Sequence, residues 1–185
     1  IRACRALSDA CDLVIQRMLA LSLPEDPAAR EDTGRRISVV ATGGYGRREL
    51  CPYSDIDVTF IVSEEEDDHL EATVRRMFLM LMETFSQRCG IKVGYGYRTP
   101  GDAGQLDHQT QTALLDTRVV AGSHGLKDRF LLEVIRHIWP AAFVRRKIGE
   151  RRLVLEKHGG TLYRIEPDVR EGPGGLRGLH LAEWL

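Results

Sequence analysis

Asp55 and Asp57, with one residue between them, are the pair of side chains in this sequence whose type and spacing best suit the binding of a metal ion. Side chains at positions i and i+2 of a strand point to the same face, so a strand over residues 55–62 projects both carboxylates together. Like charges on an otherwise apolar strand repel, and burial adds to the cost. A divalent cation removes that cost, and Mg²⁺ takes one or two carboxylates together with substrate phosphates. The pair therefore predicts a site for Mg²⁺, with Mn²⁺ as the alternative ion.

A glycine-rich turn over residues 43–46 precedes the pair and offers backbone N–H groups to phosphates. It fits neither a Walker-type loop, which continues with Gly-Lys-Ser/Thr, nor the G-x-G-x-x-G spacing of a Rossmann fingerprint. A glycine pair followed by an acidic pair on a strand is the signature of polymerase-β-like nucleotidyltransferases, and Gly44 and Asp55 fit it. The alternative is a tight turn before solvent-exposed aspartates. On the favoured interpretation, Gly43, Gly44 and the Ser54 hydroxyl hold the phosphates of a nucleoside triphosphate.

The elements that must position these residues are helices and strands that alternate, followed by a helical second half. Residues 24–34 are polar, hold two prolines and a glycine, and predict a loop. Gly94 and Gly96, in the third predicted strand, indicate a close approach to the backbone. Apolar periodicity predicts helices over residues 5–21, 64–88, 126–139 and 143–157, and strands over 37–41, 55–62 and 91–98. Residues 114–120 fit a fourth strand, with a helix as the alternative that periodicity leaves open.

Two of the predicted helices have recognisable details. Ser63 and Glu66 form a capping-box pattern at the start of the second helix, and Gly90 follows its end. Tyr45 is expected to pack under the glycine turn. The first helix repeats apolar residues close to the helical period, at Leu7, Cys11, Val14, Met18 and Leu21.

The fold class that these elements predict is α/β, in the α+β arrangement, with a short mixed sheet, flanking helices and a helical C-terminal segment. We divide the chain into an N-terminal helix and loop (1–34), a core (35–125) and a helical segment (126–185) that packs back through residues 172–177. The chain starts with Ile1 and stops inside an apolar pattern, so we expect a fragment of a larger protein.

Composition excludes several classes of protein. At 185 residues, 43% hydrophobic and 29% charged, the chain resembles ordinary globular domains. Its net charge of −1 argues against a general nucleic-acid binder. No apolar run reaches the length of a membrane span, and no signal peptide is recognisable. Four cysteines without a C-x-x-C pair indicate reduced thiols. We expect a cytoplasmic protein without membrane contact.

Three stretches resemble the nucleotidyltransferase domain of the bacterial PII-protein uridylyltransferases, within the polymerase-β-type superfamily. Residues 43–57 read Gly-Gly-Tyr-Gly-Arg-Arg-Glu-Leu-Cys-Pro-Tyr-Ser-Asp-Ile-Asp, and residues 91–99 are similar to a family strand. Residues 166–177 read Glu-Pro-Asp-Val-Arg-Glu-Gly-Pro-Gly-Gly-Leu-Arg, a motif that also resembles one in glutamine-synthetase adenylyltransferases. The resemblance implies a polymerase-β-like fold and Mg²⁺-dependent transfer of UMP from UTP to a tyrosine of a PII-type signalling protein, with release of pyrophosphate.

The resemblance also implies roles for individual residues. Asp55 and Asp57 would hold the metal, and such enzymes generally use a third carboxylate on a neighbouring strand. Asp116, an acid in an apolar run, is the candidate for it; the alternative is an ion pair with Arg118. From the chemistry of guanidinium, Arg47 and Arg177 could each bind a phosphate through two hydrogen bonds; the alternative for both is a structural salt bridge.

Arg177 is the candidate phosphate-binding residue in the tail motif. Two positions depart from the residues usual in the family, one in the glycine turn and one directly after Arg177. Arg48 stands where the family usually has Gly, and Gly178 stands where it typically has Asp. These departures keep alternatives open: transfer of another nucleotide such as AMP to another protein, a small molecule or RNA, or a catalytically inactive nucleotide-binding regulatory module.

Overall fold

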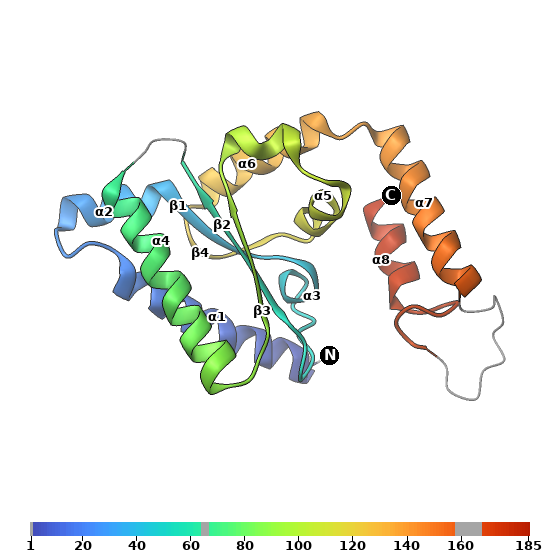
Figure 1. Ribbon diagram of the computed structural model, residues 1–185, viewed down its shortest axis with the longest axis horizontal. Helices are drawn as coiled ribbons and strands as arrows, with labels where there is room; N and C mark the ends of the chain where they lie inside the picture. Colours follow the sequence, from blue (N-terminus) through green and yellow to red (C-terminus); the bar gives the residue numbers. More distant parts are fainter. Residues whose placement is uncertain (1, 64–66, 158–167) are drawn as a thin grey trace. The chain divides into compact units, whose positions relative to one another are not determined.

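A computed structural model describes residues 2–63, 67–157 and 168–185 (Figure 1). The chain forms two compact units, residues 1–137 and residues 138–185. The first unit contains α1 (Arg2–Ser22), α2 (Pro27–Arg36), β1 (Ile37–Ala41), α3 (Gly43–Gly46), β2 (Ile56–Val62), α4 (Asp68–Leu81), the π-helix η1 (Met82–Arg88), β3 (Val93–Arg98), the 3-10 helix η2 (Pro100–Gln105), α5 (His108–Leu115), β4 (Arg118–Gly122) and α6 (His124–His137). The second contains α7 (Pro140–Lys157) and α8 (Leu176–Trp184).

A four-stranded mixed sheet in the order β3-β2-β1-β4 forms the centre of the first unit. The strand β1 runs antiparallel to β2 and β4, whereas β2 and β3 are parallel. Every residue of β1 is buried, because the strand lies between β2 and β4 in a sheet that helices cover on both faces. The predicted short mixed sheet with flanking helices is confirmed.

The strand β2 divides its side chains between the two faces of the sheet. Ile56, Val58 and Phe60 belong to a core on one face of the sheet, with Ile15 and Met77 among its fully buried members. The helices α1 and α4 lie on that face (Figure 1). Burying such a side chain stabilises the fold by roughly 1.5–3 kcal/mol. The helix α6 packs on the other face of the sheet, against β1 and β2. Asp57 lies on that second face because it alternates with the core residues.

Two predicted elements are wrong. Residues 24–34 do not form a loop, because α2 begins at Pro27, where Asp26 accepts a hydrogen bond from the Ala29 backbone N–H at 2.8 Å. A proline at the first helical position and an aspartate cap are favourable helix starts, which the loop interpretation ignored. Residues 114–120 do not form one strand either: α5 ends at Leu115 and β4 starts at Arg118.

The helix predicted over residues 64–88 is confirmed where the structure describes it. Residues 64–66, including Glu66 of the capping-box pattern, lie outside the described residues. Asp67 caps α4 and accepts a hydrogen bond from the His69 backbone N–H at 2.7 Å. The helical path continues through η1 and stops before Gly90, whose φ of +67° is the left-handed conformation that commonly ends helices.

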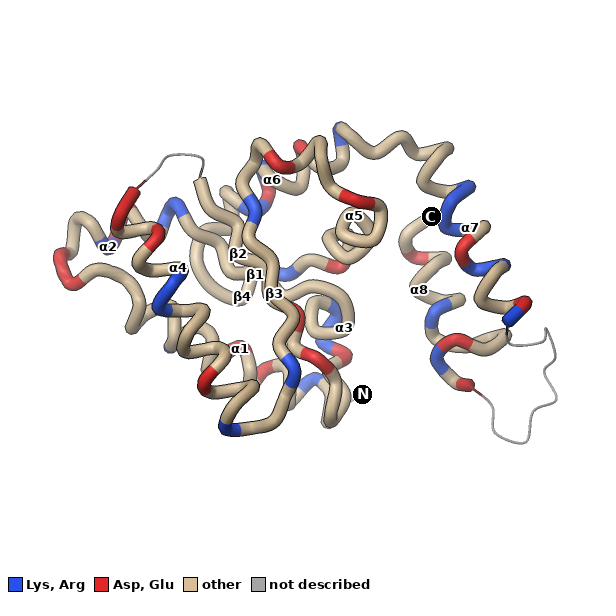
Figure 2. Tube along the Cα trace, viewed as in Figure 1, with Lys and Arg blue, Asp and Glu red and all other residues tan. Residues whose placement is uncertain are grey.

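The second unit holds α7, α8 and the glycine-rich loop before α8. Figure 2 shows acidic and basic residues interspersed along the chain in both units, in agreement with the near-neutral net charge. No helix among the described residues has both the length and the apolar character needed to cross a bilayer.

Candidate active site

Asp55 and Asp57 form a negatively charged site at the start of β2. Asp57 is half-buried and Asp55 is exposed. Burial raises the pKa of the Asp57 carboxyl above its ordinary value, and the nearby charge of Asp55 raises it further. Within residues 2–63, 67–157 and 168–185, no hydrogen bond or ion pair to either carboxylate is present. The pair therefore carries negative charge that the described protein groups do not neutralise.

Two glycines border the Asp57 carboxylate, one near each of its oxygens. Gly94 is the β3 partner of Asp57, and a methyl group on Gly94 would overlap Asp57 Oδ1. A methyl group on Gly43 would lie 3.6 Å from Asp57 Oδ2. Two positions further along the strands, a methyl group on Gly96 would lie 3.0 Å from Thr59 Oγ1. The predicted close approach to these strand glycines is confirmed, and the approaching groups are the side chains of β2.

The glycine turn itself is the short helical turn α3. Gly43 has a φ of +57°, which glycine adopts without the penalty that a Cβ atom brings. The backbone N–H of Arg47 donates to the Gly43 carbonyl at 3.1 Å, and that of Gly46 donates to the Thr42 carbonyl at 3.0 Å. The Thr42 N–H donates to the Asp57 carbonyl at 3.1 Å, which ties the turn to β2.

Three side chains fix the turn: Asp12 and Tyr45, which are buried, and Arg118, which is half-buried; we call this set the clamp. The Tyr45 hydroxyl donates to Asp12 Oδ1 at 2.7 Å, and Arg118 donates to both Asp12 oxygens, at 2.6 and 3.0 Å. Arg118 also donates to the carbonyl oxygens of Tyr45 and Gly46, at 3.3 Å each. The predicted packing of Tyr45 under the turn is confirmed, since only 1% of the residue is exposed.

The clamp also holds Tyr45 in its protonated state. Burial raises the pKa of the Tyr45 phenol far above its ordinary value, and the hydrogen bond to Asp12 adds to the shift. The Arg118 guanidinium lies 5.5 Å from the centre of the Tyr45 ring, a favourable cation–π distance. Sequence reasoning missed Asp12, although an acid beside Cys11 on a helical face is a signal that could have found it.

Asp116 lies beside the turn and pairs with Arg47. Only 10% of the Asp116 side chain is exposed, and Arg47 Nε also lies 2.9 Å from Glu49 Oε2. Over the described part of the chain, no group of three or more His, Cys, Asp and Glu could hold a metal, so Asp116 does not complete a cluster with the aspartate pair. Asp116 does form an ion pair, but with Arg47 and not with the expected Arg118, because Arg118 binds Asp12. A catalytic role for Asp116 stays a prediction.

The segment between the turn and β2 contains two residues other than glycine with left-handed backbone. Arg48 has a φ of +60° and Tyr53 a φ of +66°. The departure at Arg48 therefore has a physical cost, because glycine is the residue that tolerates this conformation best. Ser54 follows Tyr53, and its backbone N–H donates to the Cys51 carbonyl at 3.0 Å, so the chain turns just before Asp55.

Arg177 belongs to the second unit, where its Nε lies 3.2 Å from Glu171 Oε1. The loop before it is strongly ordered by hydrogen bonds. Asp168 Oδ1 accepts from the backbone N–H groups at positions 170 and 171, and Arg151 of α7 donates to the carbonyls at 171 and 172, at 2.8 Å each. Residues 166 and 167 of the tail motif lie outside the described residues. A phosphate-binding role for Arg177 stays a prediction.

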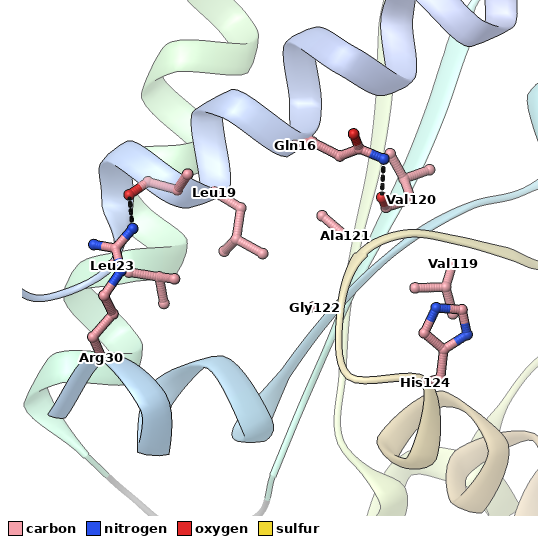
Figure 3. A pocket seen from close by; sticks show the side chains of 10 residues that line it. Gln16, Leu19, Leu23, Arg30, Val119, Val120, Ala121, Gly122 and His124 are labelled. Atoms are coloured by element: carbon pink, nitrogen blue, oxygen red, sulfur yellow. Dashed lines mark hydrogen bonds between the residues drawn. The ribbon is translucent and has the colours of Figure 1, made fainter. Parts of the chain in front are cut away.

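A hollow of about 380 Å³ lies elsewhere, between α1 and the outer edge of β4 (Figure 3). Two of its polar side chains already have partners: Gln16 Nε2 donates to the Val120 carbonyl at 3.0 Å, and Arg30 donates to the Ala20 carbonyl at 2.6 Å. None of the described residues that line it is acidic. This hollow therefore lacks the ligands of a metal–triphosphate site, unlike the start of β2.

Comparison with known proteins links the chain to one enzyme family. The sequence model of the family described as GlnD PII-uridylyltransferase matches residues 142–185. A curated relative from Erythrobacter litoralis is 38% identical over 86% of this chain and 17% of its own length. Relatives from Caulobacter vibrioides and Phenylobacterium zucineum are 35% and 33% identical, over 98% and 100% of this chain and 20% of their own lengths.

All three relatives are named bifunctional uridylyltransferase/uridylyl-removing enzymes. The chain spans about a fifth of their length or slightly less. The similarity covers both the stretch with Asp55 and Asp57 and the glycine-rich tail motif, which first indicated the resemblance. Over most of its own length, the chain is therefore similar to bacterial uridylyltransferase/uridylyl-removing enzymes.

Proposed function

We propose that the chain acts in the cytoplasm as a nucleotidyltransferase, which transfers UMP from UTP to a PII-type signalling protein and releases pyrophosphate. The observation that carries the proposal is the half-buried Asp57 carboxylate, bordered by Gly43 and Gly94 without a neutralising partner among the described residues. A protein tolerates such a charge where a ligand compensates it. The names of the relatives support uridylyl transfer as the reaction.

Mg²⁺ fits the donors present at this site, and Mn²⁺ fits the same set. Asp55 and Asp57 supply hard carboxylate oxygens, and two protein ligands leave positions for phosphate oxygens and water. When bound, such an ion would supply charge stabilisation to the triphosphate as the bond to its α-phosphorus breaks. The raised pKa of Asp57 supports this assignment, because it reports a carboxylate that lacks a positive neighbour.

The chain's own groups would bind and orient the nucleotide. Gly43 and Gly44 would direct backbone N–H groups to the β- and γ-phosphates, with the Ser54 hydroxyl beside them. Arg47 would bind a phosphate oxygen, and its pairing with Asp116 supports a role for that acid in orienting the guanidinium. The acceptor hydroxyl then attacks the α-phosphorus and pyrophosphate leaves in line.

A direct assay tests the proposal: the protein is incubated with UTP, Mg²⁺ and a PII-type acceptor, and pyrophosphate release and acceptor mass are followed. We expect transfer with the unaltered chain and none with Asp57→Asn. Asp128→Asn, which alters an exposed acid of α6, is the matched control and should leave transfer unchanged. If pyrophosphate were released with ATP but not with UTP, the reaction would be adenylyl transfer. If the nucleotide were transferred to RNA or a small molecule but not to the PII-type protein, the proposed acceptor would be wrong.

A second candidate is a nucleotide-binding regulatory module without catalysis. The pairing of Asp116 with Arg47 favours it, because the candidate third carboxylate is already neutralised. Such a module would bind a nucleoside triphosphate with Mg²⁺ in a calorimeter but release no pyrophosphate with any acceptor. Asp116→Asn separates the two candidates further, since loss of transfer with unchanged nucleotide affinity would assign Asp116 to catalysis.

A further inference from the structure

Two thiols that lie far apart in the sequence meet beside the proposed active site. Cys4 Sγ, on the first turns of α1, lies 3.8 Å from Cys51 Sγ, and 47 positions separate the two residues. Cys51 is exposed and Cys4 is half-buried, and both are free thiols. A small oxidant can therefore reach the pair from solvent.

We propose that Cys4 and Cys51 form a reversible disulfide that restrains the loop before Asp55. The chemistry that would act on this site is a soluble disulfide such as oxidised glutathione. Its effect on nucleotidyl transfer rests on the proposed function, but the formation of the bond does not.

The loop over residues 51–55 is held loosely, so a covalent link would change its freedom. Leu50 before it is buried, at 3% exposed, and Ile56 after it is fully buried. Between these anchors every residue is exposed or half-buried, and the side chain of Tyr53 is fully exposed. The bond would thus restrain a stretch between Leu50 and β2 in which no residue is buried.

The helix α1 already makes a series of contacts with the segment that leads into this loop. Asp12 binds Tyr45, and Asp9 lies 3.5 Å from Arg48. Cys4 and Cys51 continue the series, with the helix and the segment running in opposite directions. A disulfide would extend a contact line that begins at the clamp under the glycine turn.

The reaction is a balanced thiol–disulfide exchange. The Cys51 thiolate attacks one sulfur of oxidised glutathione, which forms a mixed disulfide and releases one glutathione thiolate. Cys4, once deprotonated, attacks the Cys51 sulfur of that mixed disulfide, forms the intramolecular bond and displaces the second glutathione. Two protein thiols are oxidised, one glutathione disulfide is reduced, and the two protons pass to the released glutathione thiolates.

The conditions for the reaction follow from the thiol environment. The hydrogen bond with Cys4 raises the pKa of the Cys51 thiol, with burial as a smaller cause. Less of the reactive thiolate is then present near neutral pH, so exchange is expected to accelerate as the pH rises. The oxidation is therefore run at an alkaline pH and quenched with acid.

The test treats the full chain with oxidised glutathione, alkylates the remaining thiols and maps the peptides by mass spectrometry. We expect two of the four thiols to disappear, with the peptides of Cys4 and Cys51 joined. Cys89→Ser, which removes another exposed thiol, is the matched control and should leave the joined peptides unchanged. Glutathione retained on Cys51, or alkylation of Cys4 and Cys51 to the same extent as Cys89, would overturn the proposal.

A second measurement tests the restraint on the loop. Hydrogen exchange at the Ser54 amide should slow at least tenfold on oxidation and recover with dithiothreitol, in the unaltered chain but not in Cys4→Ser or Cys51→Ser. Transfer should slow severalfold over the same cycle. If the reduced protein shows no transfer, the proposed function fails while the disulfide result stands. If the bond forms but neither exchange at Ser54 nor transfer changes, the restraint is wrong.

Discussion

Asp12 and Asp57 are two acids of the same unit with opposite surroundings. Asp12 accepts three hydrogen bonds from Arg118 and Tyr45, and only 7% of the residue is exposed. Asp57 is half-buried, lies near a second carboxylate and has no such partner among the described residues. The comparison shows how one fold uses buried acids in two ways. A fully paired acid holds the backbone in place, whereas an unpaired acid stores an unfavourable charge that a ligand can relieve.

The largest expected effect is that of Asp57→Asn, which should change catalytic activity and stability in opposite directions. Asp57→Asn should reduce nucleotidyl transfer on the order of a thousandfold or more, because it removes several kcal/mol of charge stabilisation. The same change should raise the thermal unfolding midpoint without divalent cations, since it removes an uncompensated charge. Pyrophosphate release and calorimetry measure the two effects. A variant that loses both activity and stability would place Asp57 in the same class as Asp12.

At the paired acid, removing the partner should damage the fold. Arg118→Met leaves the Asp12 carboxylate buried with an incomplete set of partners, which costs about 3–5 kcal/mol of unfolding free energy. Urea denaturation measures the loss. Arg136→Met, at an exposed ion pair with Glu133, should cost less than about 1 kcal/mol and serves as the control. Equal losses in the two variants would mean that the clamp is no stronger than a surface ion pair.

The pH dependence of stability should isolate the charge on Asp57. Its pKa is raised in the folded protein, so its contribution is most favourable below the unfolded pKa, near 3.8, and is lost as the pH rises through the folded pKa. We expect the stability of the unaltered chain relative to Asp57→Asn to fall across that window in a chelating buffer. Thermal unfolding at a series of pH values, with and without Mg²⁺, measures it. Mg²⁺ should recover the loss at neutral pH in the unaltered chain alone, and a flat difference curve would argue against an uncompensated charge.

The smallest expected effect is on the free energy of unfolding and comes from the left-handed backbone at Arg48. Arg48→Gly should stabilise the protein by about 0.5–1 kcal/mol, because relief of the left-handed strain exceeds the entropy that glycine loses. Arg48→Ala, which removes the ion pair with Asp9 but keeps a Cβ atom, is the matched control and should give no gain. The urea unfolding midpoints of the two variants measure the difference. If alanine stabilised the protein as much as glycine, the left-handed backbone would not be the cause.

Local sequence patterns predicted well the strands and glycines that surround Asp57. Residues 37–41 are β1 with the predicted bounds, and the strand of Asp57 starts one residue later than predicted. The strand glycines were predicted to allow a close approach, and Gly94 does accommodate Asp57. These features follow from side-chain alternation and from the size of glycine, both of which are properties of neighbouring residues.

The buried face of α1 shows why the paired site was harder to predict. Val14 and Leu21, two of its periodic apolar residues, are 38% and 58% exposed. The buried stripe instead includes Ser8, Asp12 and Ser22. Polar side chains can occupy a buried face when each finds a partner: the hydroxyls of Ser8 and Ser22 donate to the carbonyls four residues before them, and Asp12 accepts hydrogen bonds from Arg118.

The sequence by itself determined the acidic pair, the glycine turn before it, the strands that carry them and the family resemblance, because each depends on residues close together in the chain. Only the tertiary structure decided which acids are neutralised. Asp12 meets Arg118 across 106 positions, and Asp116 meets Arg47 across 69. It also brought Cys4 to Cys51. The free energy of a buried charge depends on what surrounds it in space, and for these residues folding alone supplies those neighbours.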